Sequence, residues 1–410
     1  MKENKTKVFL TGATGVMGMA GLKELSSYPE KYDITVLARP SKVNRRKLKP
    51  YEKKGVRVLW GDLLDKDVLS RGIQDCDIIL HVGGMVSPMA DLYPEKTMKV
   101  NVGSMQHITD IIKGIESGDP SRIIKLVYIG SVAQYGSKMP PHHWGNASHE
   151  LCPSKFDKYG ESKVRAEELM KTSGIRKWVS LRQTGILHPG LLKNAGNPVA
   201  FHTPIHGVLE WISVEDSGRL LERVCRSDVP EEFWNKCYNV GGGEKFRLIN
   251  IEFERGILKT MGCPPPEKVF EPNWFATDNF HGMWFEDSDL LDDILHFREE
   301  DTFEACLMRI KKSLPFYYKL APVVPAFFIK PFMKKVASKK ELGPLRWIKD
   351  NDAEKIEAAW GSLENYKRIQ GWEDMHTPEL SRVTPDITRE DTLDAALVDT
   401  FSSVDKVSEN

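Results

Sequence analysis

The chain has 410 residues, which is enough for an ordinary domain with further structure attached but not for three large domains. Hydrophobic residues make up 40% and charged residues 28%, a globular composition, and the 58 basic and 58 acidic residues cancel, which disfavours a nucleic-acid binder. The six cysteines follow no C-x-x-C or framework spacing and the first residues are polar. We therefore expect reduced thiols in a cytoplasmic protein, and no metal site because His142 and His143 lack spaced partners.

A glycine-rich loop, TGATGVMG, lies between a predicted strand at Lys7–Thr11 and a predicted helix at Met17–Leu25. This order of strand, loop and helix is typical of dinucleotide-binding proteins, in which the amino terminus of the helix attracts a pyrophosphate. The residues that we expect to contact the cofactor here are Gly12, Thr14, Gly15, Val16, Met17 and Gly18.

Four more apolar runs of strand length follow, with helical patterns between most of them. They are Tyr32–Ala38, Val56–Trp60, Cys76–Val82 and Ile124–Ile129. This alternation predicts an α/β fold, a Rossmann-type doubly wound parallel sheet over residues 5–190.

The segment after the second predicted strand, LARPSKVNRRKL, is basic where a carboxylate would bind the ribose of NAD. Arg39 stands at that place, and Arg45 and Arg46 follow closely. Because guanidinium groups suit a 2′-phosphate, the segment favours NADP, with NAD as the other cofactor considered.

Ser131, Tyr159 and Lys163 are the predicted catalytic residues. Tyr159 and Lys163 form a Y-x-x-x-K pair that lies on one face of a predicted helix, and Ser131 ends the fifth predicted strand. A nearby ammonium, together with the positive charge of a nicotinamide, is expected to lower the pKa of the tyrosine, so that it can exchange a proton with an alcohol or ketone.

On these motifs the chain resembles the extended short-chain dehydrogenase/reductase family, which is also called the NAD-dependent epimerase/dehydratase superfamily. Further segments that resemble the family are GDLLD at 61–65, HVGG at 81–84, VNVGSMQHI at 100–108 and LRQTGILHPG at 181–190. The resemblance extends over about residues 5–315. It implies cofactor contacts by Asp62, Leu63, Val82, Gly83, Gly84 and Asn101, besides Tyr159 and Lys163.

The resemblance also implies a mechanism, in which Tyr159 is the acid or base, Lys163 tunes it and binds the ribose, and Ser131 orients the reacting oxygen. Dehydratases of the family carry an Asp-Glu pair where this chain has Val132 and Ala133, so we expect no dehydration.

The sixth-strand turn carries Gly185 in place of the asparagine that is usual in sugar-nucleotide enzymes. This favours the branch of 3β-hydroxysteroid dehydrogenases and carbonyl reductases. The residues expected to contact substrate are Val132, Trp144, Gly185 and His188, and His143 is a further candidate.

Residues 191–315 are expected to form a smaller substrate-binding domain that is interleaved with the Rossmann core, and residues 316–410 an additional helical extension. Within 314–336 an apolar stretch is interrupted by prolines and contains Lys330, Lys334 and Lys335, so it cannot be a continuous membrane span. Three interpretations stay open: a lid over an apolar substrate, a peripheral membrane contact, or a surface buried against a partner subunit. A helix with Trp360 on its apolar face and a loose acidic tail are expected to follow.

Together these features predict an NADP-preferring oxidoreductase that interconverts a secondary alcohol and a ketone or aldehyde on a hydrophobic substrate such as a steroid, terpenoid or lipid. We expect it to be a homodimer, as is usual in the family. The alternatives are an NAD-dependent sugar-nucleotide epimerase and a redox sensor that binds NADP without turnover.

Overall fold

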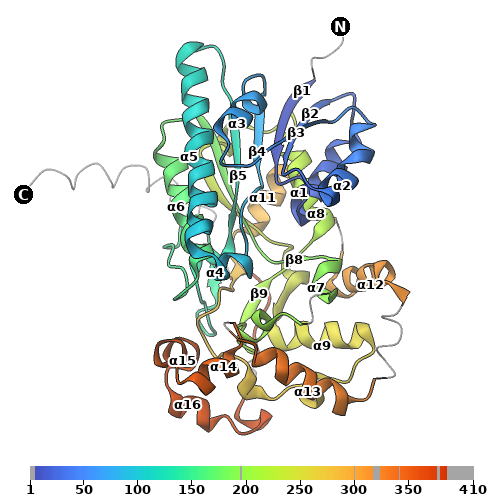
Figure 1. Cartoon of the computed structure of the whole chain (residues 1–410), viewed down its shortest axis with the longest axis vertical. Coiled ribbons are helices and arrows are strands. Elements are labelled where there is room, and N and C mark those ends of the chain that lie inside the picture. The colour runs from blue at the N-terminus through green and yellow to red at the C-terminus, as the bar shows by residue number, and fades with distance from the viewer. Residues whose placement is uncertain are drawn as a thin grey trace, which may run out of the picture.

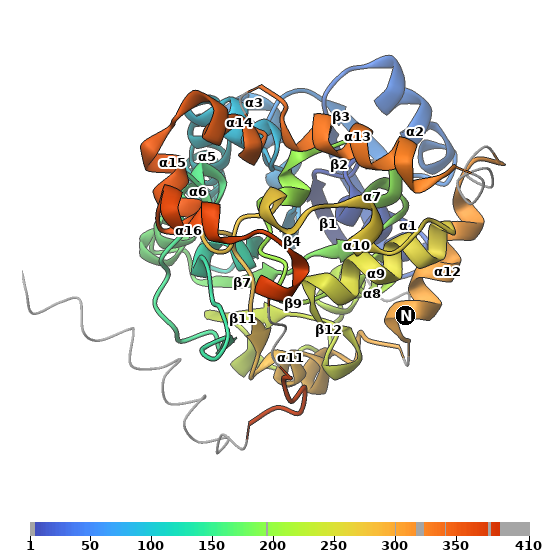
Figure 2. The ribbon, with the colours of Figure 1, turned by 90° about the horizontal axis from the view of Figure 1, so that it is seen from below.

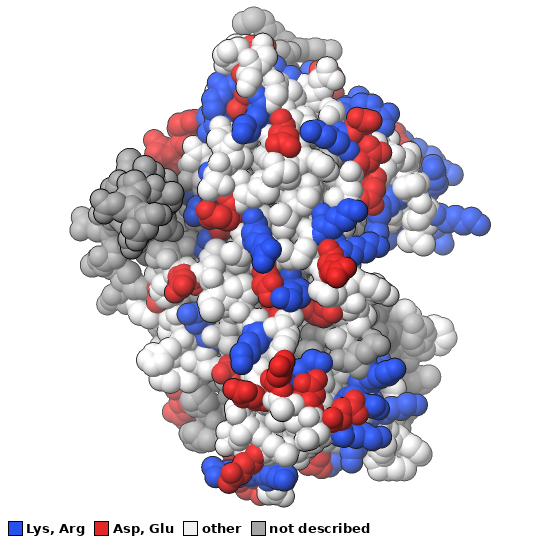
Figure 3. Space-filling view, turned by 60° about the vertical axis from the view of Figure 1, so that its left-hand side comes forward, with Lys and Arg blue, Asp and Glu red and all other residues white. Residues whose placement is uncertain are grey.

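The structure is a computed structural model that describes residues 5–193, 196–299, 301–316, 324–340, 342–375 and 379–385. Figure 1 shows a parallel sheet flanked by helices in the upper part of the molecule and a mainly helical region below it. Acidic and basic side chains are intermingled over the face in Figure 3, in keeping with the net charge of zero.

Seven parallel strands form the main sheet, in the order β11-β7-β5-β4-β1-β2-β3. Their bounds are Thr6–Thr11 (β1), Tyr32–Ala38 (β2), Arg57–Trp60 (β3), Ile78–His81 (β4), Lys125–Ser131 (β5), Lys177–Gln183 (β7) and Lys236–Val240 (β11). The chain winds outward from β1 to β3 on one side and from β4 to β11 on the other. This is the predicted Rossmann-type sheet, and it places a switch point between β1 and β4, where such folds bind ligands.

The sheet is buried on both faces, as the nearly continuous apolar character of its strands predicts. On one face α1 (Val16–Leu25), α8 (Val214–Arg223) and α11 (Ser288–Leu295) pack against it through residues such as Leu22 and Leu221. On the other face lie α3 (Lys66–Ile73), α5 (Pro94–Gly118) and α6 (Lys158–Thr172), with Ile108 and Met170 in that core.

The chain leaves this layered part after β7, returns to it for α8, β11 and α11, and otherwise builds the lower region. Three short strand pairs join the two parts: β8 (Ile186–Leu187) with β10 (Ile212–Ser213), β9 (Val208–Glu210) with β12 (Arg247–Ile249), and β6 (Trp144–Gly145) with β13 (Trp284–Phe285). A buried ion pair joins Glu210 of β9 to Arg247 of β12, with 3.0 Å between Oε2 and Nε.

The helices of the lower region are α7 (Pro189–Lys193), α9 (Asn250–Met261), α10 (Pro266–Val269), α12 (Phe303–Ser313) and α13 (Ala326–Ala337). Helix α10 contacts both α9 and α13, and all three can be followed in the view from below in Figure 2. They share a core with the 3-10 helix Pro198–Phe201, which includes Phe201, Phe270 and Trp274. The smaller carboxy-terminal region and the additional helices after it agree with the predicted fold class.

The described part of the apolar stretch 314–336 is mainly α13, which continues through Pro331. Val336 and Ala337 on the inner face of α13 are buried. Phe327 and Phe328 on its outer face are 67% and 61% exposed. Residues 317–323 of the stretch lie outside the described residues, as do the last dozen residues of the chain, which are expected to be loose. None of the described helices is both long and apolar enough to cross a membrane.

The predicted Trp360 helix is wrong in one respect, because it is two helices, α15 (Ala353–Trp360) and α16 (Leu363–Arg368). Gly361 separates them at φ 74°, a left-handed conformation that an α-helix cannot include. Trp360 itself is buried, and its Nε1 donates a hydrogen bond to the carbonyl oxygen of Phe275 at 2.9 Å.

Candidate active site

The glycine loop joins β1 to α1 and packs against the loop after β4. Gly12 has φ 73°, and a Cβ atom there would lie 2.6 Å from the backbone nitrogen of Gly83. A Cβ on Gly18 would collide with the carbonyl oxygen of Gly12. Gly15 and Val16 are exposed at the amino terminus of α1, whereas Met17 and Gly18 are buried in the core beneath it. The loop therefore leaves open backbone at a helix amino terminus, which fits the pyrophosphate of a dinucleotide.

The basic segment after β2 begins with Arg39, which is exposed at the carboxyl end of the strand. The guanidinium of Arg45 lies 4.5 Å from the ring centre of Trp60, and the Lys47 ammonium donates a hydrogen bond to the carbonyl oxygen of Thr14 at 2.9 Å. Of the basic residues in this segment, Arg39 is exposed directly at the strand end, whereas Arg45 is stacked on an aromatic ring.

The remaining predicted cofactor residues lie on neighbouring strand ends. Asp62 is exposed after β3, where its carboxylate accepts a hydrogen bond from the backbone of Leu64, and Leu63 beside it is partly buried. Val82 and Gly84 flank Gly83 in the loop after β4, which lies against the glycine loop.

Asn101 of α5 fixes the loop after β4. Its side chain bonds the backbone nitrogen and oxygen of Met85 at 2.7 and 3.0 Å and donates to the Ser162 hydroxyl at 2.8 Å. It thus connects this loop to the amino-terminal part of α6.

Ser131, Tyr159 and Lys163 are brought together where β5 meets α6. The Lys163 ammonium donates a hydrogen bond to the carbonyl oxygen of Ile129 at 2.7 Å and lies 5.8 Å from the ring centre of Tyr159. The hydroxyl of Ser131 lies close enough to the phenol of Tyr159 to act on its pKa. The three predicted catalytic residues therefore form one cluster at the carboxyl edge of the sheet.

The electrostatics of this cluster differ from the expectation in one respect. Burial raises the pKa of Tyr159 to about 12, although the hydrogen bond with Ser131 acts in the opposite direction. Burial likewise lowers the pKa of Lys163 to about 8, against the charge of Glu167. The expected lowering of the tyrosine pKa is thus not produced by the protein groups, because desolvation outweighs them.

A buried polar network that the sequence analysis missed supports the cluster. Arg182 of β7 donates to both carboxylate oxygens of Glu167, at 2.6 and 3.1 Å, and Gln134 donates to the same carboxylate at 3.0 Å. Gln134 in turn accepts a hydrogen bond from the backbone nitrogen of Ser131 at 2.7 Å. Glu167 lies one helical turn after Lys163, but no sequence signal places Arg182 beside it.

A cavity of about 730 Å³ begins at this cluster and extends into the lower region. On the catalytic side, Val16, Val132, Tyr159, Gly185 and His188 line it. Three of these follow β1, β5 and β7, so the cavity opens at the carboxyl ends of the parallel strands, where ligands bind in such sheets. The predicted substrate contacts Val132, Gly185 and His188 therefore face a cavity.

Trp144 and His143 do not line that cavity, contrary to their predicted role. The Trp144 ring lies under the guanidinium of Arg247 at 4.8 Å and against Trp284 of the neighbouring strand. His143 is buried edge-on to Trp284, with 4.9 Å between ring centres. The pairing of β6 with β13 turns this part of the loop into the protein core instead.

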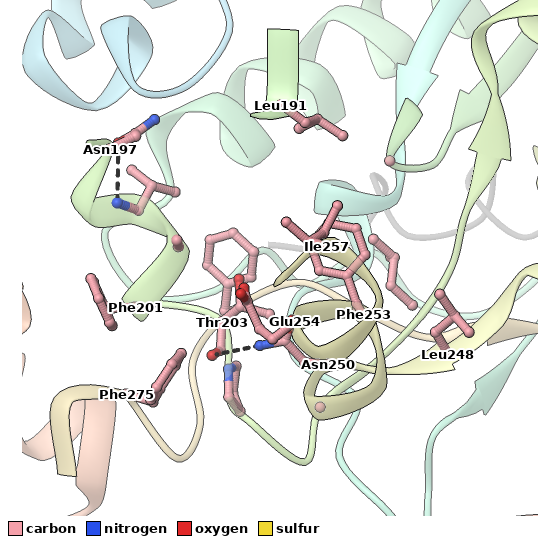
Figure 4. Close-up of a pocket in the computed structure, with 18 of the residues that line it drawn as sticks. Leu191, Asn197, Phe201, Thr203, Leu248, Asn250, Phe253, Glu254, Ile257 and Phe275 are labelled. Carbon is pink, nitrogen blue, oxygen red and sulfur yellow. Dashed lines mark hydrogen bonds between the residues drawn. The ribbon is translucent and has the colours of Figure 1, made fainter. Parts of the chain in front are cut away.

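The far part of the cavity is mainly apolar and comes from segments to which the sequence analysis assigned no site residue. Figure 4 shows Phe201, Phe253, Ile257 and Phe275 around it, together with one carboxylate, that of Glu254. Val324, Ile329, Phe332 and Met333, at the start of α13 and along it, complete this wall.

Comparison with known proteins agrees with this arrangement. Residues 8–183 match the NAD dependent epimerase/dehydratase family. Over these residues, which are less than half of the chain, the sequence is similar to that family. The expected relation to the branch of 3β-hydroxysteroid dehydrogenases stays a prediction.

The individual relatives are distant. The inverting UDP-N-acetylglucosamine 4,6-dehydratase of Campylobacter jejuni is 31% identical over 117 residues, which are 26% of this chain and 32% of the relative. The chain thus matches about a third of the length of that curated relative.

Two solved structures with similar folds are known with bound NAD. The dTDP-glucose 4,6-dehydratase of Bacillus anthracis has a TM-score of 0.60 at 17% identity, over 75% of this chain and 96% of the other. The UDP-glucose 4-epimerase of Thermus thermophilus has a TM-score of 0.58 at 18% identity, over 75% and 98%. At these identities the likeness establishes the fold.

Proposed function

We propose that the protein is an NAD(P)-dependent oxidoreductase that interconverts a secondary alcohol and a ketone or aldehyde on an apolar substrate. The observation that carries this proposal is the position of Ser131, Tyr159 and Lys163 at one end of a cavity whose other walls are mainly apolar. A group that can donate or accept a proton, the phenol of Tyr159, thus lines a mainly apolar cavity.

Each of the clustered residues has a distinct role in the proposed reaction. The nicotinamide cofactor supplies or accepts the hydride when it is bound. Tyr159 is protonated at neutral pH and donates its phenolic proton to the oxygen of a ketone, or receives a proton from an alcohol. Ser131 donates a hydrogen bond to the same oxygen, and Lys163 is held beside the phenol by the Ile129 carbonyl. The glycine loop and Asn101 shape the cofactor side.

The apolar walls support a hydrophobic substrate. Among the described residues that line the cavity, Lys138 is the only lysine or arginine. A nucleoside diphosphate carries two or more negative charges, and sites for such groups normally use arginines or helix amino termini. The wall that α13 contributes supports the lid interpretation of that segment.

An NAD-dependent sugar-nucleotide epimerase is the second candidate, and the comparisons favour it over the first. The similar structures include a UDP-glucose 4-epimerase in complex with NAD. The similarity to dehydratases does not favour a dehydration reaction for this chain. Val132 and Ala133 follow Ser131 here, and neither side chain can donate or accept a proton. A redox sensor that binds the cofactor without turnover is the third candidate.

Several finer points stay predictions. Exposed Arg39 supports NADP, although the similar structures were determined with NAD. The cytoplasmic location and the homodimer rest on the sequence alone. Exposed Phe327 and Phe328 on α13 support a peripheral membrane contact of that segment.

The first experiment is to denature the purified protein and identify any nucleotide that it releases. Near-stoichiometric NAD would favour the epimerase, which returns the hydride to its own intermediate and keeps its cofactor. An exchangeable site that prefers NADPH, with turnover of apolar ketones, supports the oxidoreductase. Turnover of UDP-glucose but of no ketone would overturn it.

A further inference from the structure

One acidic side chain lines the far part of the cavity among the described residues, and it is Glu254 of α9. Figure 4 shows its carboxylate directed into the space between Thr203 and Ile257. Its neighbours along the wall include Phe253 and Ile257 of the same helix. A carboxylate in such surroundings loses much of its hydration, which costs free energy unless a partner replaces the water.

The described part of the chain supplies no such partner. No described residue donates a hydrogen bond to this carboxylate or forms an ion pair with it, whereas Glu252 two residues earlier has both kinds of contact. Nearby polar groups are already paired with the backbone: Asn250 donates to the carbonyl oxygen of Thr203 at 3.3 Å, and Asn197 accepts from Val199 at 3.1 Å. Glu254 is therefore an acceptor that faces the cavity.

The surrounding fold does not require a carboxylate at this place. An aliphatic side chain there would face apolar neighbours such as Phe253 and Ile257 and would avoid the cost of desolvation. Glu210, a buried acidic group in this part of the protein, is instead bound by Arg247 and by the backbone nitrogen of Gly243. The contrast indicates that the partner of Glu254 comes from outside the described part of the chain.

We infer that Glu254 is a specificity-determining residue, which binds a hydrogen-bond donor on the substrate remote from the carbon that reacts at Tyr159. The substrate class is then an apolar molecule with two polar positions: a carbonyl or secondary alcohol at one end and a hydroxyl or ammonium group toward the other. The inference rests on the proposed function for the identity of the reacting end, but the binding of the remote donor is a separate property.

The probes for the experiment are straight-chain methyl ketones of increasing length that end in a methyl, a hydroxyl or an ammonium group. The varied length removes any need to know the distance between the two ends in advance. Binding is measured by calorimetry in the Tyr159→Phe background with cofactor present, so that turnover does not interfere. Turnover is measured separately with Tyr159 intact.

In the protein with native Glu254, one chain length is expected to bind several-fold tighter with a terminal donor than with a methyl group, the usual contribution of one hydrogen bond. Glu254→Leu should abolish this preference and tighten the methyl series. Glu254→Gln should keep the preference for the hydroxyl and lose that for the ammonium. Glu357→Leu, on the exposed surface of α15, is the matched control and should change neither series.

Equal preferences in the native and Glu254→Leu proteins would overturn the inference. A preference that depends on Glu254, without turnover of any ketone, would contradict the proposed reaction and leave the binding site intact. Turnover of ketones without such a preference would support the proposed reaction and overturn the inference about Glu254. Because Glu254→Leu and Glu254→Gln differ in size and polarity, a folding defect in one does not prevent the test with the other.

Discussion

The two ends of the cavity are built on opposite principles. At the sheet, the polar groups are satisfied by the protein itself: Lys163 by the Ile129 carbonyl, and Glu167 by Arg182 and Gln134. At α9, the carboxylate of Glu254 faces the cavity without a described partner. A paired network fixes the position of reacting groups, while an unpaired acceptor in apolar surroundings makes binding depend on the ligand.

The largest expected effect comes from removing the proton donor at the sheet end of the cavity. Tyr159→Phe removes the proton donor and leaves the ring, so we expect a loss of turnover by roughly 10²–10⁴-fold. Binding of the cofactor, measured by calorimetry, should change little. Tyr93→Phe, at an exposed tyrosine, is the control. An unchanged rate would exclude the proposed acid–base role and favour the cofactor-binding sensor.

The supporting network is tested by Arg182→Met. This change leaves Glu167 buried without its ion pair, which should lower the free energy of unfolding by about 3–5 kcal/mol. Urea denaturation measures the effect. The exposed pair Arg368–Glu364 provides a matched control, and Arg368→Met should cost about 1 kcal/mol or less. Equal effects of the two changes would mean that the network does not stabilise the catalytic end.

At the other end of the cavity, the burial of Glu254 predicts a free energy of unfolding that falls as the pH rises. Burial raises the pKa of Glu254 from 4.5 to about 7, so the folded protein holds a proton that the unfolded chain releases between these values. Stability contributed by the protonated group is therefore lost as the pH rises through this window. Glu254→Gln does not titrate, and it should become more stable than the native protein by up to about 3 kcal/mol above pH 7.

At pH 4 the same two proteins should unfold at similar free energies, because both side chains are then neutral. Thermal or urea unfolding at both pH values measures the difference. Glu357→Gln, at an exposed position of α15, should give no such dependence on pH. A constant difference between the Glu254→Gln and native proteins across the range would contradict the assigned burial.

The cofactor side is tested by Arg39→Asp. If the exposed guanidinium binds a 2′-phosphate, NADPH should bind about 10–100-fold more weakly, as for the loss of a charged hydrogen bond, and NADH should change much less. Titration of the intrinsic fluorescence with each nucleotide is the measurement. An equal effect on both nucleotides would remove the NADP preference. Arg46→Asp tests whether the neighbouring charge alone is responsible.

The smallest effect concerns the outer face of α13. Replacing Phe327 and Phe328 by serine should weaken sedimentation with vesicles of anionic phospholipid by about tenfold if that face contacts a membrane. Val43→Ser, at an exposed apolar residue of α2 (Lys42–Glu52), is the control. No sedimentation of the native protein, combined with a change in its oligomeric state in the double variant, would favour the partner subunit instead.

The sequence by itself determined the Rossmann-type half, because its signals are local. The loop around Gly12 and Gly18 has to follow a strand and open a helix, and β2 has the bounds that its apolar run predicts, Tyr32–Ala38. The clustering of the three predicted catalytic residues was predictable for the same reason, since Tyr159 and Lys163 share a helix face and Ser131 ends a strand. The two helices after Asp352 were not separated, because the conformation of Gly361 is not visible in the apolar pattern.

Only the tertiary structure decided the far end of the site. Glu254 shares the cavity with Tyr159 although 95 positions separate them in the chain, and α13 completes the wall from still further along. Arg182 meets Glu167 only because α6 packs against β7, and Trp144 turns into the core only because β6 pairs with β13. Such contacts depend on which segments the fold brings together, and the periodicity of apolar residues along the chain does not indicate which distant segments will meet.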